Sequence, residues 1–289
     1  MSPLSWPGES AASLAYPGIA LPGSNVCLDF HGDPLRAGLV LFSDGNHHMA
    51  LEQALRDFLR RNPAATDVFY TTTPPRLAIE AVESGGLRVG NLSLSLRPHL
   101  AISPPAVLDR LVELGALRAH RPFVRGRGSV LLVPRGNPLG IHGIADLSRE
   151  GLRLFISNPR TEAVSHAGYA ETLRRMAAAR GIAFSPEAGR PRLVSGELIH
   201  HREAPEFIAG GRADAAIVYH HLALRYVRIF PEHFEMVPLG QSADPDNPRA
   251  TIHIGLAADP GPWGRVAFDY LLGDECAATY DRHGLDRAD

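Results

Sequence analysis

The sequence predicts an α/β fold in which mostly parallel sheets are flanked by helices. Short apolar runs alternate along the chain with segments whose apolar residues recur at helical spacing, and polar turn residues separate the two kinds of segment. This alternation is typical of strand–helix–strand units. The chain has 289 residues, 45% of them hydrophobic, which is enough for one large domain or for two lobes of moderate size.

The first clear unit runs from Leu39 to Arg61. Leu39–Phe42 is expected as a buried strand, Ser43 to Asn46 as a turn, and Met49–Arg61 as a helix. The other expected strands are 67–70, 100–103, 129–134, 152–157, 215–219, 234–238 and 251–257. The other expected helices are 75–83, 105–114, one that follows residues 158–162 and ends at 179, 205–210, 263–272 and 275–283. Residues 1–36 are rich in Pro, Gly and Ser without a period, so an arm lying on the surface or partly disordered is expected there.

Composition excludes several classes of partner and chemistry. The formal net charge of −2 argues against nucleic acid, whose partners usually carry a basic face. All 29 basic residues are arginine, so any bound anion must be met by Arg, protonated His or backbone N–H groups. No nucleophile elbow, phosphate-binding loop, zincin helix or dinucleotide fingerprint is present. We therefore expect neither an enzyme nor a cofactor.

The two cysteines, Cys27 and Cys276, lie far apart in sequence and are more typical of unpaired core residues than of a disulfide. No apolar run approaches the ~18 residues of a membrane span. The N-terminus lacks a positive region followed by an apolar stretch, so it is not recognisable as a signal peptide. The expected location is periplasmic or extracellular if a signal has been removed, and cytoplasmic otherwise.

Polar loops follow the expected strands. In open α/β sheets, ligands bind beyond the carboxyl ends of the strands, on the loops that enter the helices. This rule selects the loops 43–47, 71–75, 103–105, 157–165 and 219–221, which are rich in Ser, Thr, Asn and His.

The order of these segments resembles the type II periplasmic binding proteins, and among them the molybdate-binding components of transporters. The likeness covers about residues 38–285, and its most specific part is the Asn-Pro-x-x-Ile-x-x-x-x-Asp-Leu run at 137–147. The resemblance implies a two-lobed fold with the ligand in a cleft between the lobes. It also implies lobe boundaries, namely an arm at 1–37, a first lobe of 38–126 plus 248–289, and a second lobe of 127–247.

The resemblance also implies where ligand contacts lie. The family's first-loop serine falls at Asn46, its second-loop serine near Thr72 or Thr73, its second-lobe donor segment on Thr161–Ser165, and its hinge tyrosine on Tyr219. Both signature serines are replaced, which puts molybdate as the ligand in doubt. Asn46 and the threonines have a second interpretation, since each is also a natural cap for the helix that follows.

Three adjacent histidine pairs fall in these predicted cleft segments: His47-His48, His200-His201 and His220-His221. Neighbouring residues of an extended segment point in opposite directions, so we expect at most one member of each pair to face a ligand. His47 and His201 are favoured, and His221 is a weaker candidate.

Two ligand chemistries fit this set of residues. With Arg202 and donating imidazoles, the site suits an oxyanion or a small organic anion. With neutral imidazoles it suits a transition metal held by His47, His201, Glu162 and Glu203. The anion is favoured, because helix N-termini converge on the predicted cleft. The expected ligand-binding residues are Asn46, His47, Thr72, Thr73, Ser103, Thr161, Glu162, His201, Arg202 and Tyr219.

The resulting hypothesis is a monomeric solute-binding protein that presents a small anion to the membrane component of an ABC-type transporter by hinge closure. Two alternatives stay open. One is a binding protein for a transition metal or metal chelate, and the other is a cytoplasmic ligand-sensing domain of the same fold.

Overall fold

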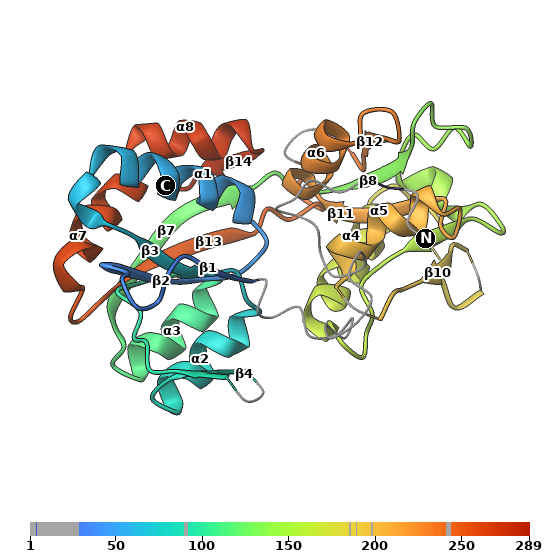
Figure 1. The fold of residues 1–289 in the computed structure, drawn as a ribbon. Coiled ribbons are helices and arrows are strands. Elements are labelled where there is room, and N and C mark those ends of the chain that lie inside the picture. Colours follow the sequence, from blue (N-terminus) through green and yellow to red (C-terminus); the bar gives the residue numbers. More distant parts are fainter. Residues whose placement is uncertain are drawn as a thin grey trace. The chain divides into compact units, whose positions relative to one another are not determined.

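The structure is a computed structural model that describes residues 4, 29–89, 92–184, 186–188, 190–197, 199–240 and 244–289 (Figure 1). The described residues divide into two compact units. We call residues 29–125 with 250–289 the first lobe, and residues 126–249 the second lobe. No helix in the described ranges is long and apolar enough to cross a membrane.

A seven-stranded sheet forms the centre of the first lobe, in the order β1-β3-β2-β6-β13-β7-β14. β2, β3 and β6 are parallel to one another, whereas β1 and β13 run antiparallel to their neighbours, and so does β7 to β13. The strands are β1 (Phe30–His31), β2 (Leu39–Ser43), β3 (Val68–Thr71), β6 (Leu100–Ser103), β7 (Leu117–Gly126), β13 (Thr251–Ala257) and β14 (Leu285–Arg287). A separate antiparallel pair is β4 (Leu87–Val89) with β5 (Leu92–Leu94).

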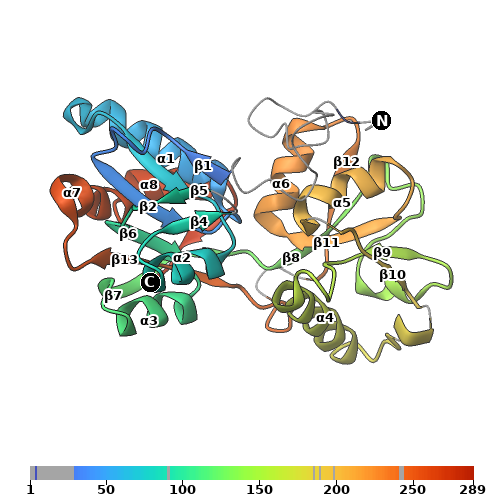
Figure 2. The same ribbon diagram turned by 60° about the horizontal axis from the view of Figure 1, so that its bottom comes forward.

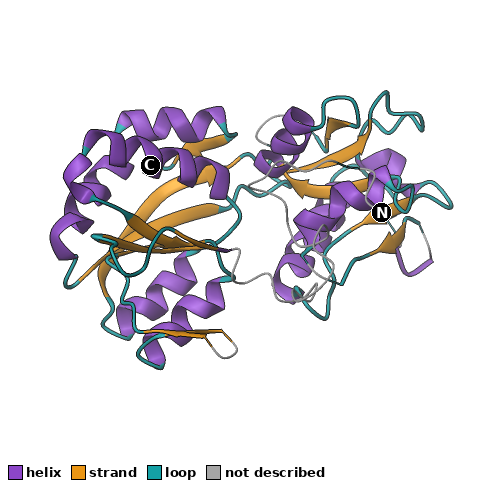
Figure 3. Cartoon of the chain, viewed as in Figure 1, coloured by secondary structure: helices purple, strands orange, loops and turns teal. Residues whose placement is uncertain are grey.

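Helices cover both faces of this sheet (Figures 1 and 3). One face packs its Leu and Ile side chains against α1, α7 and α8, and the other packs against α2 and α3. The apolar side chains alternate between the two faces along each strand, as the two-residue period of a strand requires. The helices are α1 (His48–Arg61), α2 (Pro75–Glu83), α3 (Pro105–Glu113), α7 (Gly261–Leu271) and α8 (Asp274–Arg282), with the short turn η3 (Pro63–Ala65) after α1.

The second lobe has a five-stranded sheet in the order β10-β9-β11-β8-β12. α4 packs on one face, and α5 and α6 contact β8 and β11 on the other (Figure 2). The strands are β8 (Ser129–Pro134), β9 (Arg153–Phe155), β10 (Arg192–Val194), β11 (Ala215–Tyr219) and β12 (Phe234–Pro238). The helices are α4 (Ala163–Ala178), α5 (His200–Ala209) and α6 (His220–Ile229), with the short turns η4 (Ile144–Ser148) and η5 (Pro186–Ala188).

The expected α/β class with helices flanking the sheets is confirmed. Neighbouring strands are parallel in the runs β3-β2-β6 and β10-β9-β11, whereas β8 and β13 run antiparallel to both of their neighbours. The antiparallel strands β7, β8 and β13 adjoin the points in the sequence where the chain passes from one lobe to the other. A strand that leads into or out of a lobe has no crossover helix of its own, so it is free to run antiparallel.

Part of the predicted arm belongs to the first lobe. Phe30 and His31 form β1, which pairs antiparallel with Thr71 and Tyr70 at the end of β3. The arm expected over residues 1–37 therefore does not extend as far as residue 37. Residues 1–28, with the exception of Leu4, lie outside the described part of the chain.

Two helices begin at histidines where the sequence predicted otherwise. α5 begins at His200 rather than at 205 and carries Pro205 in its interior, and α6 begins at His220 in a segment that was expected to continue an extended strand. The pairs His200-His201 and His220-His221 therefore lie on helices, and the expectation that neighbours point in opposite directions does not apply to them.

Candidate functional site

The carboxyl edge of the first-lobe sheet is lined with buried polar side chains. β2, β3 and β6 end at Ser43, Thr71 and Ser103, and helices α1, α2 and α3 begin a few residues further on. The buried polar residues at this edge are Ser43, Asp44, His47, Thr71, Thr72, Thr73 and Ser103. Such a set at one edge, beside three helix N-termini, is the arrangement expected of a ligand-binding edge in an open sheet.

Ser103 stands out within this set. Its side chain is 3% exposed, and its Oγ has no hydrogen-bond partner among the described residues. A buried hydroxyl without a partner costs ~1–3 kcal/mol, so native proteins seldom retain one without a reason.

The threonines after β3 do not cap α2, whose N-cap position is Pro74. Thr71 Oγ1 accepts the amide hydrogen of Ser43 at 3.2 Å, and Thr73 Oγ1 donates to Thr71 Oγ1 at 3.4 Å. Thr72 Oγ1 lies 2.9 Å from His31 Nε2. Thr71 thus joins the ends of β2 and β3, whereas Thr72 joins the loop after β3 to β1. Gly45 allows the close approach of the loops after β2 and β3, since a Cβ at this position would lie 2.7 Å from the carbonyl oxygen of Thr72.

His47 is fully buried, and both of its ring nitrogens are engaged. The Ser43 hydroxyl donates to the carbonyl of Asp44, so His47 Nε2 must donate to Ser43 Oγ, 3.1 Å away. His47 Nδ1 then accepts from the Tyr280 hydroxyl at 2.9 Å. Burial lowers the pKa of His47 to about 3, so the ring is neutral and joins the first ligand loop to α8.

Two carboxyl groups are buried at this edge among the described residues. Asp29 accepts from the Thr72 hydroxyl at 3.4 Å, and Asp44 lies in the loop after β2. Burial raises the pKa of Asp44 to about 6, although the amide hydrogen of Asn46, 3.0 Å from Oδ1, partly opposes the shift. Asn46 therefore takes part in this loop through its backbone. It is not the N-cap of α1, because that position is His47. Asp44 is not among the residues that the sequence predicts for the site.

The carboxyl edge of the second-lobe sheet carries a second set of polar groups. Ser157, two residues beyond β9, is fully buried, and its Oγ has no partner among the described residues. Its carbonyl accepts from His166 Nδ1 at 2.6 Å, and Asn158 Nδ2 donates to the carbonyl of Gly196 at 2.8 Å. Each lobe thus presents one buried, unsatisfied serine hydroxyl at its ligand edge. Ser157 lies within the predicted loop 157–165 but was not chosen there.

Glu162 and His200 meet at the N-terminus of α5. The Glu162 carboxylate accepts the amide hydrogen of His200 at 2.8 Å. Burial raises the pKa of Glu162, the His200 amide lowers it, and the neighbouring Glu203 raises it further. The His200 ring is 4% exposed and stacks on Phe155 with ring centroids 5.3 Å apart.

The other predicted second-lobe residues lie close by but differ in exposure. Thr161 is exposed, whereas His201, Arg202 and Tyr219 are half-buried. The carbonyl of His201 accepts from the Tyr226 hydroxyl, and the charge of Arg202 acts on the pKa of the same tyrosine. Tyr219 ends β11, on the same edge as Ser157, and its ring lies 4.9 Å from that of Tyr169.

Within the described ranges, no group of three or more His, Cys, Asp or Glu side chains is placed to hold a metal ion. Glu162 accepts from His200, and Glu203 accepts the amide hydrogen of Glu197 at 3.3 Å. Cys276 is buried, which raises the pKa of its thiol to about 12, and Cys27 lies outside the described residues.

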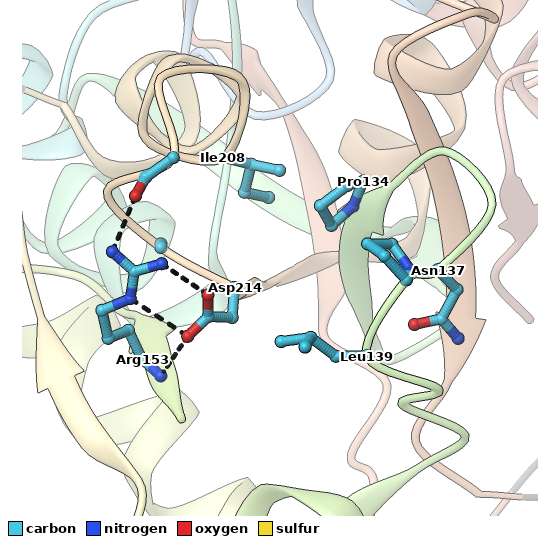
Figure 4. Close-up of a pocket in the computed structure, with 9 residues that line it drawn as sticks. Pro134, Asn137, Leu139, Arg153, Ile208 and Asp214 are labelled. Atoms are coloured by element: carbon cyan, nitrogen blue, oxygen red, sulfur yellow. Dashed lines mark hydrogen bonds and ion pairs between the residues drawn. The ribbon is translucent and has the colours of Figure 1, made fainter. Parts of the chain in front are cut away.

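A separate pocket of about 230 Å³ lies at the opposite edge of the second-lobe sheet, where β9 and β11 begin (Figure 4). Its only charged groups are Arg153 and Asp214, which form a bidentate pair with distances of 2.6 and 3.1 Å. Arg153 donates a further bond of 2.7 Å to the carbonyl of Gly211. Because its cation is already neutralised, this pocket is a poor site for an anion.

Comparison with known proteins identifies the family of this chain. A family model described as bacterial extracellular solute-binding protein matches residues 39–286. The molybdate-binding protein ModA of Mycobacterium tuberculosis is 25% identical over 219 residues, which cover 74% of this chain and 75% of that protein.

Solved structures show the same fold at lower identity. The periplasmic molybdate-binding protein of Azotobacter vinelandii is 15% identical with a TM-score of 0.58, and the match covers 87% of this chain and all of that one. Peb3 from Campylobacter jejuni is 16% identical with a TM-score of 0.61, covering 86% of this chain and all of that one. The sulfate-binding protein SubI of Mycobacterium tuberculosis is 15% identical with a TM-score of 0.58, covering 87% of both chains.

Proposed function

Because the chain belongs to the family of bacterial extracellular solute-binding proteins, we propose that it captures a small anion and presents it to the membrane component of an ABC-type transporter. The anion is an oxyanion or a small organic anion, held by groups from the carboxyl edges of both sheets. The protein acts as a monomer outside the cytoplasm, it catalyses no reaction, and its partner is a membrane protein rather than a nucleic acid.

The buried serine hydroxyls are the observation that carries this proposal. Ser103 is the last residue of β6, Ser157 lies two residues beyond β9, and neither Oγ has a partner among the described residues. A ligand oxygen would satisfy each hydroxyl and remove the cost of its burial. Neutral donors and helix N-termini stabilise an anion without placing a counter-charge in the site.

The names of similar proteins support the same class of ligand. ModA of Mycobacterium tuberculosis and the Azotobacter vinelandii protein are named for molybdate, and SubI is named for sulfate. In this proposal, ligand contacts from both lobes exist together only in a closed form, so the ligand shifts the population toward closure.

Binding to serine variants tests the proposal. Purified protein, freed of bound ligand, is titrated by calorimetry with molybdate, tungstate, sulfate, phosphate and glycolate. We expect at least one of these anions to bind. Ser103→Ala and Ser157→Ala should each weaken that binding by ~0.5–1.5 kcal/mol, which is roughly a 2- to 12-fold rise in Kd.

Ser148→Ala is the matched control, because the Ser148 hydroxyl already donates to the carbonyl of Ala145 at 2.7 Å, away from the ligand edge. Its affinity for the anion should equal that of the unmodified protein. Binding of Ni²⁺ or Zn²⁺ but of no anion in the panel would contradict the proposal.

A further inference from the structure

The ring nitrogen Nε2 of His200, in the second lobe, can discriminate between anions. His200 Nε2 is buried and has no hydrogen-bond partner among the described residues. The ring belongs to the first residue of α5, at the same sheet edge as Ser157, whose hydroxyl also has no described partner. The two unsatisfied groups lie in the part of the lobe that the proposed function assigns to the ligand.

The protonation state of this nitrogen follows from the contacts of the ring. The backbone of Ile217 forms a hydrogen bond that favours protonated His200, so the ring donates to that carbonyl. Because Nε2 has no partner, the donating atom is Nδ1. Burial against Phe155 and Tyr169 lowers the pKa of His200 to about 3, so the ring carries one proton, on Nδ1. Nε2 therefore carries a lone pair and no proton, and it can only accept a hydrogen bond.

The neighbouring groups do not supply that hydrogen. The Tyr169 ring lies 5.0 Å from the His200 ring, but its oxygen accepts from the backbone N–H of Tyr219 and does not bond to His200 Nε2. His166 Nδ1 donates to the carbonyl of Ser157. Glu162 is itself an acceptor and is bonded to the His200 amide. None of these groups, nor the Ser157 hydroxyl, is a hydrogen-bond partner of His200 Nε2 among the described residues.

We propose that the ligand of this protein is an anion that also carries a hydroxyl group, and that this hydroxyl donates to His200 Nε2. The inference rests on the proposed function and narrows its ligand class. A fully deprotonated oxyanion such as sulfate or molybdate has only acceptor oxygens and leaves Nε2 unsatisfied. Inorganic phosphate retains at least one O–H at neutral pH, as do phosphate monoanions and hydroxy acids. Sites built to bond a hydroxyl discriminate strongly against analogues that lack it.

Matched pairs of probes test this inference. Phosphate is compared with sulfate, and glycolate with acetate, by isothermal calorimetry at pH 7. In each pair the hydroxylated member is expected to bind about tenfold or more tightly, since one unsatisfied buried acceptor separates the two complexes. His200→Phe keeps a ring to stack on Phe155 but removes the acceptor, so the preference should fall to within about threefold.

His142→Phe is the control, because His142 is an exposed histidine of the same lobe, and the preference should persist in that variant. If His200→Phe fails to fold, ¹⁵N NMR of the unmodified protein provides a second measurement. The Nε2 resonance is expected to be that of an unprotonated nitrogen at pH 7, and to change when phosphate binds but not when sulfate is added.

The possible failures are distinguishable. Sulfate that binds as tightly as phosphate, or a preference that survives in His200→Phe, would overturn this inference and leave the proposed function standing. A proton found on Nε2 at pH 7 would overturn it as well. If none of the anions binds, the proposed function and this inference both fall.

Discussion

At the scale of single residues, the ligand edges contain groups that the folded protein does not satisfy by itself. Ser103 and Ser157 are buried hydroxyls without described partners, each placed where a parallel strand gives way to a helix. Stability alone would favour alanine at both positions. In the proposed function a ligand offsets this cost, because sites for ligands often trade stability for binding.

This trade predicts opposite effects of one substitution on stability and on binding. Ser103→Ala removes an unsatisfied hydroxyl, so the ligand-free protein should gain ~1–3 kcal/mol. At ~2–4 °C per kcal/mol, the melting temperature should rise by several degrees. Calorimetric melting of the ligand-free variant checks this expectation, with Ser148→Ala as the control that should not be stabilised. A melting temperature that falls would mean that Ser103 has a structural partner.

The sequence located these residues only in part. Ser103, Thr72 and Thr73 were predicted from the rule that ligands lie beyond strand ends, and all three are buried at that edge. Their role in binding stays a prediction. His200 was passed over in favour of His201, because the segment was interpreted as extended whereas α5 begins there. The start of α5 was predicted at Pro205, since Pro is common in the first turn of a helix, but Pro205 lies inside α5.

At the scale of elements, strand ends and helix starts were predicted best where proline or a clear apolar run marks them. α2 and the strands β6, β8 and β11 have the predicted bounds. α6 was missed because His220-His221 follows a buried strand without any capping residue or proline. β7 was not predicted from the sequence, because polar residues such as His120, Arg121 and Arg125 interrupt the alternation of apolar and polar positions that marks a strand.

A chain of polar groups links three first-lobe elements beside the ligand edge. Asp109 on α3 bonds to His120 Nε2 on β7 at 2.8 Å, and His120 Nδ1 lies 2.9 Å from His253 Nδ1 on β13. His253 is the register partner of Ser103 on β6, so these two side chains lie on the same face of the sheet. Any change in the charge of His253 is therefore felt next to the unsatisfied hydroxyl.

The pKa of His253 should respond in opposite directions to changes at its two partners. Burial lowers this pKa, His120 lowers it further, and Asp109 raises it. His120→Gln removes a neighbouring positive charge and should raise the pKa of His253, whereas Asp109→Asn removes a negative charge and should lower it. NMR titration of the histidine ring measures both shifts. Shifts of the same sign in the two variants would show that the chain of hydrogen bonds is not formed.

At the scale of the whole molecule, a buried and neutral histidine lies at the carboxyl edge of each sheet, His47 in the first lobe and His200 in the second. Burial lowers the pKa of both His47 and His200 to about 3. In the unfolded chain, both would take up a proton near the ordinary value of about 6.5. The unfolded state therefore binds more protons below this pH, and the stability that neutral burial allows is fully present above it and lost as the pH falls.

Acidification should thus weaken both lobes, and the histidines should account for much of the loss. Between pH 7 and pH 5, each of the two is expected to contribute ~2 kcal/mol to the fall in the free energy of unfolding. His47→Gln and His200→Gln should each reduce this fall. Because the two side chains belong to different lobes, their effects should add.

Asp44 acts in the opposite sense within the first lobe. Its pKa is raised to about 6, so the folded state takes up a proton between pH 6 and pH 4 that the unfolded state does not yet bind. This uptake stabilises the first lobe as the pH falls and offsets ~1 kcal/mol of the loss due to His47 between pH 7 and pH 5.

Asp44→Asn removes the offset and should make the first lobe lose stability more steeply on acidification. Urea unfolding followed at both pH values by hydrogen exchange, lobe by lobe, measures the difference. A variant whose first lobe became less sensitive to acid would contradict the assignment of a raised pKa to Asp44, and with it the buried, uncompensated charge at the ligand edge.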